Sequence, residues 1–156
     1  MDIELVCEGL QFPEGPIAMA DGSIILTEIQ GKTLTRVTPD GKRETIADVG
    51  GGPNGAAIGP DGAVYITNNG GSFAYHEVNG LNIPGATPPG YTGGSIQRVD
   101  LKTGAVTTLY TEVDGRRLEG PNDLVFDRRG NLYFTDPPYG LHGLNESPLK
   151  ELMRSE

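Results

Sequence analysis

One sequence segment occurs three times in this chain, and this repeat constrains the fold more than any other feature. Aligned without gaps, the copies read PEGPIAMADGSIILTE at residues 13–28, PNGAAIGPDGAVYITN at 53–68 and PNDLVFDRRGNLYFTD at 121–136. Each copy has a turn glycine between two short apolar runs. In the first two copies this turn is Asp-Gly, which is typical of a tight β-hairpin because such a turn needs a positive φ. The repeat therefore predicts three β-hairpins in equivalent registers.

A second hairpin is expected after each of the first two copies. The sequence TLTRVTPDGKRETIADV at residues 33–49 resembles SIQRVDLKTGAVTTLYTEV at residues 95–113. Two hairpins make a four-stranded unit of about 40 residues, the size of a β-propeller blade. We therefore expect residues 1–156 to form an all-β domain with about two and a half blades of a β-propeller. The long segments 69–94 and 137–156 are expected to be loops on the binding face, because both leave the blades at the same end.

The number of predicted blades is too small for a closed ring. Known propellers have roughly four to eight blades, and ring closure protects the edges of their sheets. Two and a half blades would leave such edges exposed. We therefore expect the sequence to be part of a longer propeller, or its copies to self-associate through exposed blade edges.

Composition excludes several classes of function. Lys and Arg number 12 against 21 Asp and Glu, a formal net charge of −9, which argues against nucleic acid and membrane as partners. Cys7 is the single cysteine, so an intrachain disulfide and a Cys-based metal site are excluded. There is no pattern of a signal peptide, and no apolar run approaches the ~20 residues that span a bilayer. We expect a soluble, cytoplasmic protein.

The repeat register predicts a cluster of polar side chains. Glu14, Asn54 and Asn122 each stand eight residues before the turn glycine of their copy, and each follows a proline. The first strand of a blade lines the central channel, so these three residues are expected to ring the channel mouth. A carboxylate and amide oxygens suit a hard cation such as Ca²⁺, which takes 6–8 oxygen ligands. Other ligands would have to complete the shell.

Purely structural explanations of the same residues stay open. Asn54 after a proline is also typical of a turn in which the side chain bonds its own backbone. For Glu14 a functional role is favoured, because a carboxylate in a crowded apolar channel is costly without a partner. Glu28, Asn68 and Asp136, six residues after the turn glycines, are expected to cap strand ends or to support the site from behind.

These motifs resemble the regucalcin/gluconolactonase family. The resemblance is carried, in order along the chain, by FPEGP at 12–16, PNG at 53–55, GPND at 120–123 and LYFTDP at 132–137. It implies a six-bladed propeller that hydrolyses sugar lactones. It also implies a divalent cation on the central axis. Ca²⁺ is the first candidate for this ion, and Zn²⁺, Mn²⁺ and Mg²⁺ are the alternatives.

The resemblance further implies individual roles. Glu14 matches the family's metal-binding glutamate, and Asn122 matches an asparagine near the metal that helps to hold the substrate or a coordinated water. Asn54 matches a channel position that contacts substrate, and Tyr139 and the 69–94 loop would border the substrate entrance. The family's general-base aspartate comes from a later blade and is expected beyond residue 156. The chain alone is therefore expected to be inactive, and a non-catalytic ligand-binding or scaffold propeller is the alternative.

Overall fold

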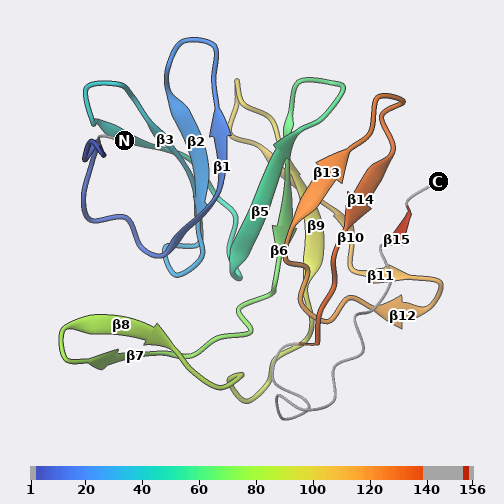
Figure 1. Ribbon diagram of the computed structural model, residues 1–156. Helices are drawn as coiled ribbons and strands as arrows, with labels where there is room; N and C mark the ends of the chain where they lie inside the picture. The colour runs from blue at the N-terminus through green and yellow to red at the C-terminus, as the bar shows by residue number, and fades with distance from the viewer. Residues whose placement is uncertain (1–2, 139–152, 155–156) are drawn as a thin grey trace.

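The computed structural model describes residues 3–138 and 153–154, which form strands and loops (Figure 1). Among these residues no helix is long and apolar enough to cross a membrane. Blade 1 consists of β1 (Pro13–Ala18), β2 (Ile24–Glu28), β3 (Thr33–Val37) and β4 (Arg43–Asp48). Blade 2 consists of β5 (Pro53–Ile58), β6 (Val64–Asn68), β9 (Ser95–Val99) and β10 (Val106–Tyr110). Both are antiparallel four-stranded meanders, as the repeat predicts.

The third sheet is larger than the sequence suggested. It holds β13 (Leu124–Phe126), β14 (Leu132–Phe134) and β15 (Met153–Arg154), so a third strand follows the predicted hairpin. The segment 137–156 was expected to be loop throughout, and β15 corrects this at its far end, where the backbone pairs with β14. Most of that segment, including Tyr139, lies outside the described residues.

The first strands of the blades are the innermost ones. Figure 1 shows β5 between β1 and β13, and β5 contacts both. Gly22, Gly62 and Gly130 all have a positive φ. The turns that contain them, between β1 and β2, β5 and β6, and β13 and β14, lie at the same end of the blades in Figure 1. The residues that begin each first strand therefore meet at the opposite end, as the register predicts.

Two apolar layers hold the blades face to face. The layer between blades 1 and 2 contains Ile25, Leu34, Ala47, Val49, Val64, Ile66 and Val99. The layer between blades 2 and 3 contains Ile96, Leu118, Leu124, Leu132 and Phe134. Strand β6 contributes to both, because successive side chains point to opposite faces of a sheet. Val64 and Ile66 face blade 1, while Tyr65 packs edge-on against Phe126 of blade 3, with ring centroids 4.9 Å apart.

The segment 69–94 is not simply a loop. It contains an antiparallel hairpin of β7 (Tyr75–Val78) and β8 (Leu81–Pro84), which Figure 1 shows at the end of the blades opposite the Asp-Gly turns. Asn79 and Gly80 form its two-residue turn with φ values of 53° and 78°. Asn-Gly is the preferred pair for such a turn, because both residues tolerate a positive φ. A similar small hairpin joins β11 (Glu112–Val113) to β12 (Arg116–Arg117) across Asp114-Gly115.

Candidate metal and substrate site

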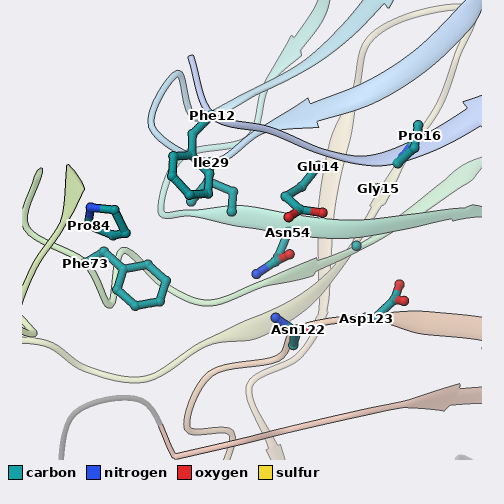
Figure 2. A pocket seen from close by; sticks show the side chains of 11 residues that line it. Phe12, Glu14, Gly15, Pro16, Ile29, Asn54, Phe73, Pro84, Asn122 and Asp123 are labelled. Carbon is teal, nitrogen blue, oxygen red and sulfur yellow. The ribbon is translucent and has the colours of Figure 1, made fainter. Parts of the chain in front are cut away.

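The three predicted channel residues line one cavity of about 320 Å³. We call it the inner cavity. Glu14 is the second residue of β1, Asn54 is the second residue of β5, and Asn122 lies two residues before the start of β13. Its wall consists of Phe12, Glu14, Gly15, Pro16, Ile29, Asn54, Gly55, Phe73, Pro84, Asn122 and Asp123. In Figure 2 the polar side chains of Glu14, Asn54 and Asn122 follow one another along the cavity, and Phe12, Ile29, Phe73 and Pro84 gather at one side.

Irregular strand pairing places the first two of these residues. The pairing of β1 with β2 shifts register after Glu14, and the pairing of β5 with β6 shifts after Pro53. Bulges of this kind bend a strand and re-aim its side chains, and they are common beside functional sites. The equivalent irregularity in two blades turns equivalent side chains toward one point.

A buried threonine in each of the first two blades ties that blade to the next. The Thr27 hydroxyl bonds the Glu14 carbonyl at 3.0 Å and the Asn54 carbonyl of blade 2. The Thr67 hydroxyl accepts the Gly55 N–H at 2.9 Å and donates to the Asn122 carbonyl of blade 3 at 2.7 Å. These bonds fix the backbone of the site residues across the gap between blades.

Two glycines allow this close approach. A Cβ on Gly15 would lie 2.6 Å from the Ala56 nitrogen and 2.7 Å from the Asn54 oxygen, and a Cβ on Gly55 would lie 2.9 Å from the Asn122 oxygen. Such distances are too short for any side chain. Gly15 and Gly55 therefore allow neighbouring blades to approach closely. This approach lets the side chains of Glu14, Asn54 and Asn122 share one cavity.

Glu14 and Asn54 differ in their surroundings. Asn54 is only 7% exposed and lies within a strand, so the alternative that it is a turn residue is wrong. The Glu14 side chain is exposed among the described residues. Within the described residues, neither side chain takes part in a hydrogen bond or an ion pair. Both side chains are therefore available to a ligand.

Asp123 is a second carboxylate in the cavity wall. Its Oδ1 accepts the Leu124 N–H at 2.8 Å, and in Figure 2 its side chain points away from Glu14, Asn54 and Asn122. The sequence analysis predicted a role for Asn122 but none for the neighbouring Asp123. Asp123 occupies the register position held by Gly15 and Gly55 in the other blades.

Glu28, Asn68 and Asp136 do not line the inner cavity. Each instead accepts backbone N–H groups from the loop that leads into the first strand of its own blade. Glu28 accepts from Gln11 at 2.6 Å, Asn68 from Gly52 at 2.8 Å, and Asp136 from Gly120 at 2.7 Å. These three residues are caps that hold the loops carrying the site residues in place.

The apolar side of the cavity had no place in the sequence prediction. Phe12, Ile29, Phe73 and Pro84 come from four separate segments, and only folding brings them together. Phe73 precedes the β7–β8 hairpin and Pro84 is its last strand residue. The Asn79-Gly80 pair could have predicted this hairpin. These apolar side chains make one side of the cavity suitable for an apolar ligand surface.

The donor set fits part of a site for a hard cation. Carboxylate and carboxamide oxygens suit Ca²⁺, Mg²⁺ or Mn²⁺, whereas Zn²⁺ prefers nitrogen and sulfur ligands. Among the described residues no group of three or more His, Cys, Asp and Glu could hold a metal ion. The chain therefore offers Glu14 and amide oxygens to a cation, and other ligands would complete its shell.

Comparison with known proteins supplies the family. The profile described as SMP-30/Gluconolactonase/LRE-like region matches residues 12–155, nearly the whole chain. The chain belongs to this family. A gluconolactonase of Zymomonas mobilis is 28% identical over 96% of the chain. A virginiamycin B lyase of Nocardia farcinica is 36% identical over 39% of the chain.

Solved structures support the fold of this family member. A gluconolactonase from Xanthomonas campestris superposes with a TM-score of 0.63 at 23% identity, over 91% of the chain. A protein of unknown function from Bacteroides caccae superposes with a TM-score of 0.62 at 12% identity, over 89% of the chain. The all-β propeller fold predicted from the repeat is confirmed. The chain spans 40% of the length of the Zymomonas relative and 42% of the Xanthomonas structure.

Proposed function

We propose that the chain supplies part of the active site of a metal-dependent sugar-lactone hydrolase. The observation that carries the proposal is the meeting of Glu14, Asn54 and Asn122 from three blades in one cavity. The family membership and the gluconolactonase relatives support this class of substrate.

Each residue has a defined part in this proposal. Glu14 and Asn122 hold a divalent cation, for which Ca²⁺ is our first candidate. Asn54 and Asn122 bond the hydroxyl groups of the lactone, while Phe12 and Phe73 cover an apolar face of its ring and exclude water there. A cation bound in this position would polarise the ring carbonyl and lower the pKa of a water molecule. The general base is assigned to a residue outside this sequence, so the chain alone should not turn over lactone.

Calorimetric titration with CaCl₂ tests the metal part of the proposal. The unmodified chain is expected to bind Ca²⁺, and Glu14→Gln is expected to weaken binding by about tenfold or more, since lesser changes around metal sites already cost this much. Glu44→Gln is the matched control, because Glu44 is exposed on β4 outside the cavity wall and should leave binding unchanged. Equal affinity in Glu14→Gln and Glu44→Gln would contradict the assignment.

A non-catalytic ligand-binding module is the second candidate function. The observation that favours it is the position of Asn54 in the cavity wall together with the apolar residues, since such a wall can bind a ligand whether or not chemistry follows. Binding of gluconate that is independent of Ca²⁺ and of Glu14 would favour this module over the hydrolase. Calcium-dependent hydrolysis of glucono-δ-lactone by the 156-residue chain would show instead that the chain is a hydrolase by itself. In that case the reaction would not need a general base from outside this sequence.

A further inference from the structure

Residues 3–8 lie ahead of blade 1 and belong to no sheet of the described chain. We call them the N-terminal segment. The repeat gives this segment a register, because the first strands of blades 1 and 2 begin at Pro13 and Pro53, 40 residues apart. Shifted by the same 40 residues, the N-terminal segment corresponds to β4, the outermost strand of blade 1. By register it is therefore the outermost strand of a preceding blade.

The N-terminal segment also packs where this register places it. The β9–β10 turn of blade 2 comes so close to β4 that a Cβ on Gly104 would lie 2.6 Å from the Ile46 oxygen. The β3–β4 turn of blade 1 comes equally close to the N-terminal segment, since a Cβ on Gly41 would lie 2.5 Å from the Val6 oxygen. Val6 and Ile46 are 40 residues apart, as the repeat requires. Blade 1 therefore receives the N-terminal segment as blade 2 receives β4.

A side-chain hydrogen bond repeats the same relationship. The carbonyl of Val49, four residues before the first strand of blade 2, accepts the N–H of Gln97 Nε2 in that blade at 3.0 Å. The carbonyl of Gly9, four residues before the first strand of blade 1, accepts the N–H of Arg43 Nη1 in that blade at 2.6 Å. The donors lie on different strands of their blades, but the acceptors occupy equivalent positions. Two separate contacts thus place residues 3–9 like the end of a preceding blade.

The strands that would pair with the N-terminal segment are absent from the part of the chain that the structure describes. β4 pairs along its length with β3, whereas the N-terminal segment pairs with no described strand. Its Ile3 and Leu5 side chains are 96% and 70% exposed. A strand position with unpaired backbone groups and exposed apolar side chains is a template for pairing with another chain. The N-terminal segment therefore points to a blade that a partner supplies.

Blade 3 has the complementary gap. Among the described residues its sheet has three strands in the order β13-β14-β15, so β15 is an edge strand with no fourth strand beside it. Leu124 of β13 packs in the layer toward blade 2, so Val125 points to the opposite face, where it is 57% exposed. In Figure 1 blade 3 and the N-terminus lie at opposite ends of the row of blades. One end of the described chain has a fourth strand without a blade, and the other has a blade without a fourth strand.

We infer that two copies of this chain associate head to tail. The N-terminal segment of each copy adds to β15 in blade 3 of the other copy, antiparallel as β4 adds to β3. Val125 of that blade then packs against the outer face of blade 1. Each copy contributes three sheets, so two copies make a ring of six, within the roughly four to eight blades of known propellers. The two contacts are identical by two-fold symmetry, and the closed ring leaves no end for a third copy.

The inference needs neither metal nor lactone, so it does not rest on the proposed function. Sedimentation equilibrium of the 156-residue chain in EDTA, over a wide range of concentrations, is expected to show monomer and dimer and nothing larger. A species that stays monomeric throughout would overturn the inference. Continuous growth to larger oligomers would overturn it as well, because the contact would then not close into a ring.

Amide hydrogen exchange identifies the strand that pairs. Alternate amides of residues 4–8 should exchange about tenfold more slowly, or slower still, where the dimer forms than in the dilute monomer, because paired N–H groups are protected. Lys102 and Thr103 are the internal control, since they lie in the exposed β9–β10 turn of the middle blade and should exchange equally in both states. A dimer in which residues 4–8 exchange as in the monomer would overturn the strand assignment.

Two proline variants test the N-terminal segment. Successive N–H groups of a strand point to opposite edges, so one of Leu5→Pro and Val6→Pro must remove a hydrogen bond to β15. That variant should raise the dissociation constant of the dimer by about tenfold or more. Neither residue lies in a described sheet, so both variants should keep the urea midpoint of the dilute chain. Undiminished dimerisation of both variants would overturn the inference.

Val125→Glu tests the other side of the contact. A carboxylate there stays exposed in the monomer but is buried without a partner in the dimer, so the dissociation constant should rise by about tenfold or more. Val106→Glu is the matched control, because Val106 is exposed on β10 of the middle blade and should leave dimerisation unchanged. Equal dissociation constants in the two variants would contradict the proposed interface.

Discussion

The hydroxyl of Thr67 in blade 2 donates a hydrogen bond of 2.7 Å to the backbone carbonyl of Asn122 in blade 3. The same hydroxyl accepts the N–H of Gly55 at 2.9 Å, so one buried side chain joins two strands that carry site residues. Thr27 makes the equivalent link from blade 1 to the Asn54 carbonyl. The geometry of the inner cavity therefore depends on contacts between blades as well as on the strands within each blade.

Replacing Thr67 with valine keeps the shape of the side chain and removes these bonds. The half-buried Asn122 carbonyl then loses the hydroxyl donor and keeps the Gly55 N–H at 2.7 Å. We expect a loss of about 1–3 kcal/mol in the free energy of unfolding, measured with urea. Thr107→Val on the exposed face of β10 is the control and should stay within about 0.5 kcal/mol. Equal stability of the two variants would show that the link contributes nothing.

Gly15→Ala should be far more harmful than Gly62→Ala. Both glycines have a positive φ, at 52° and 77°, but a Cβ on Gly62 meets nothing within 4 Å, whereas on Gly15 it meets the backbone of β5 at 2.6 Å. Gly62→Ala is expected to cost about 1–2 kcal/mol through backbone strain alone. Gly15→Ala should cost several kcal/mol and also weaken Ca²⁺ binding, because the clash displaces Asn54.

A smaller difference would disprove the close-approach explanation. If thermal denaturation shows the two alanine variants to be equally stable, then blade 1 can shift away from blade 2 without loss, and Gly15 matters only for its backbone conformation.

Asn54 and Asn68 are both buried asparagines, yet leucine should affect them in opposite ways. The Asn68 carboxamide makes four hydrogen bonds, so Asn68→Leu leaves backbone groups unpaired and should cost several kcal/mol of stability. The Asn54 carboxamide makes none within the described residues, so Asn54→Leu should be neutral or stabilising while it weakens ligand binding. Urea denaturation and calorimetry on both variants check this contrast. A strongly destabilised Asn54→Leu would mean that the carboxamide serves the fold.

Acid should weaken the ion pair between Asp61 and Arg98. Arg98 Nε lies 2.7 Å from Asp61 Oδ2, and this hydrogen bond lowers the pKa of the Asp61 carboxyl below its ordinary value. The folded pKa is thus lower than the unfolded one, near ~3.9, so the contribution to stability is complete above that pH. It is lost as the pH falls through the folded pKa. Urea denaturation between about pH 2 and 6 should show a smaller acid-induced loss in Asp61→Asn than in the unmodified chain; parallel curves would contradict this.

Much of the fold could be predicted because the patterns that specify its strands and turns lie within short stretches of sequence. The internal repeat, with a turn glycine between two short apolar runs in each copy, was enough to predict the hairpins of blades 1 and 2 and to align Glu14 with Asn54 and Asn122. The β7–β8 hairpin was equally local, since Asn79-Gly80 predicts its turn, but the abundance of Gly, Pro and Asn in segment 69–94 made it look like a loop. The third strand of blade 3 pairs with β14 from a distant part of the sequence, which local patterns do not reveal.

The sequence by itself determined the repeat, its register and therefore which end of the blades carries Glu14, Asn54 and Asn122. Only the tertiary structure decided that Glu14 is exposed, that Asn54 is a buried residue in the cavity wall, and that Asp123 shares their cavity. It also decided that Asn68 is satisfied whereas Asn69 is not. The physical reason is that burial and hydrogen-bond partners come from segments far apart in the chain. Two adjacent, identical residues differ in their hydrogen bonding here because different segments of the folded chain surround them.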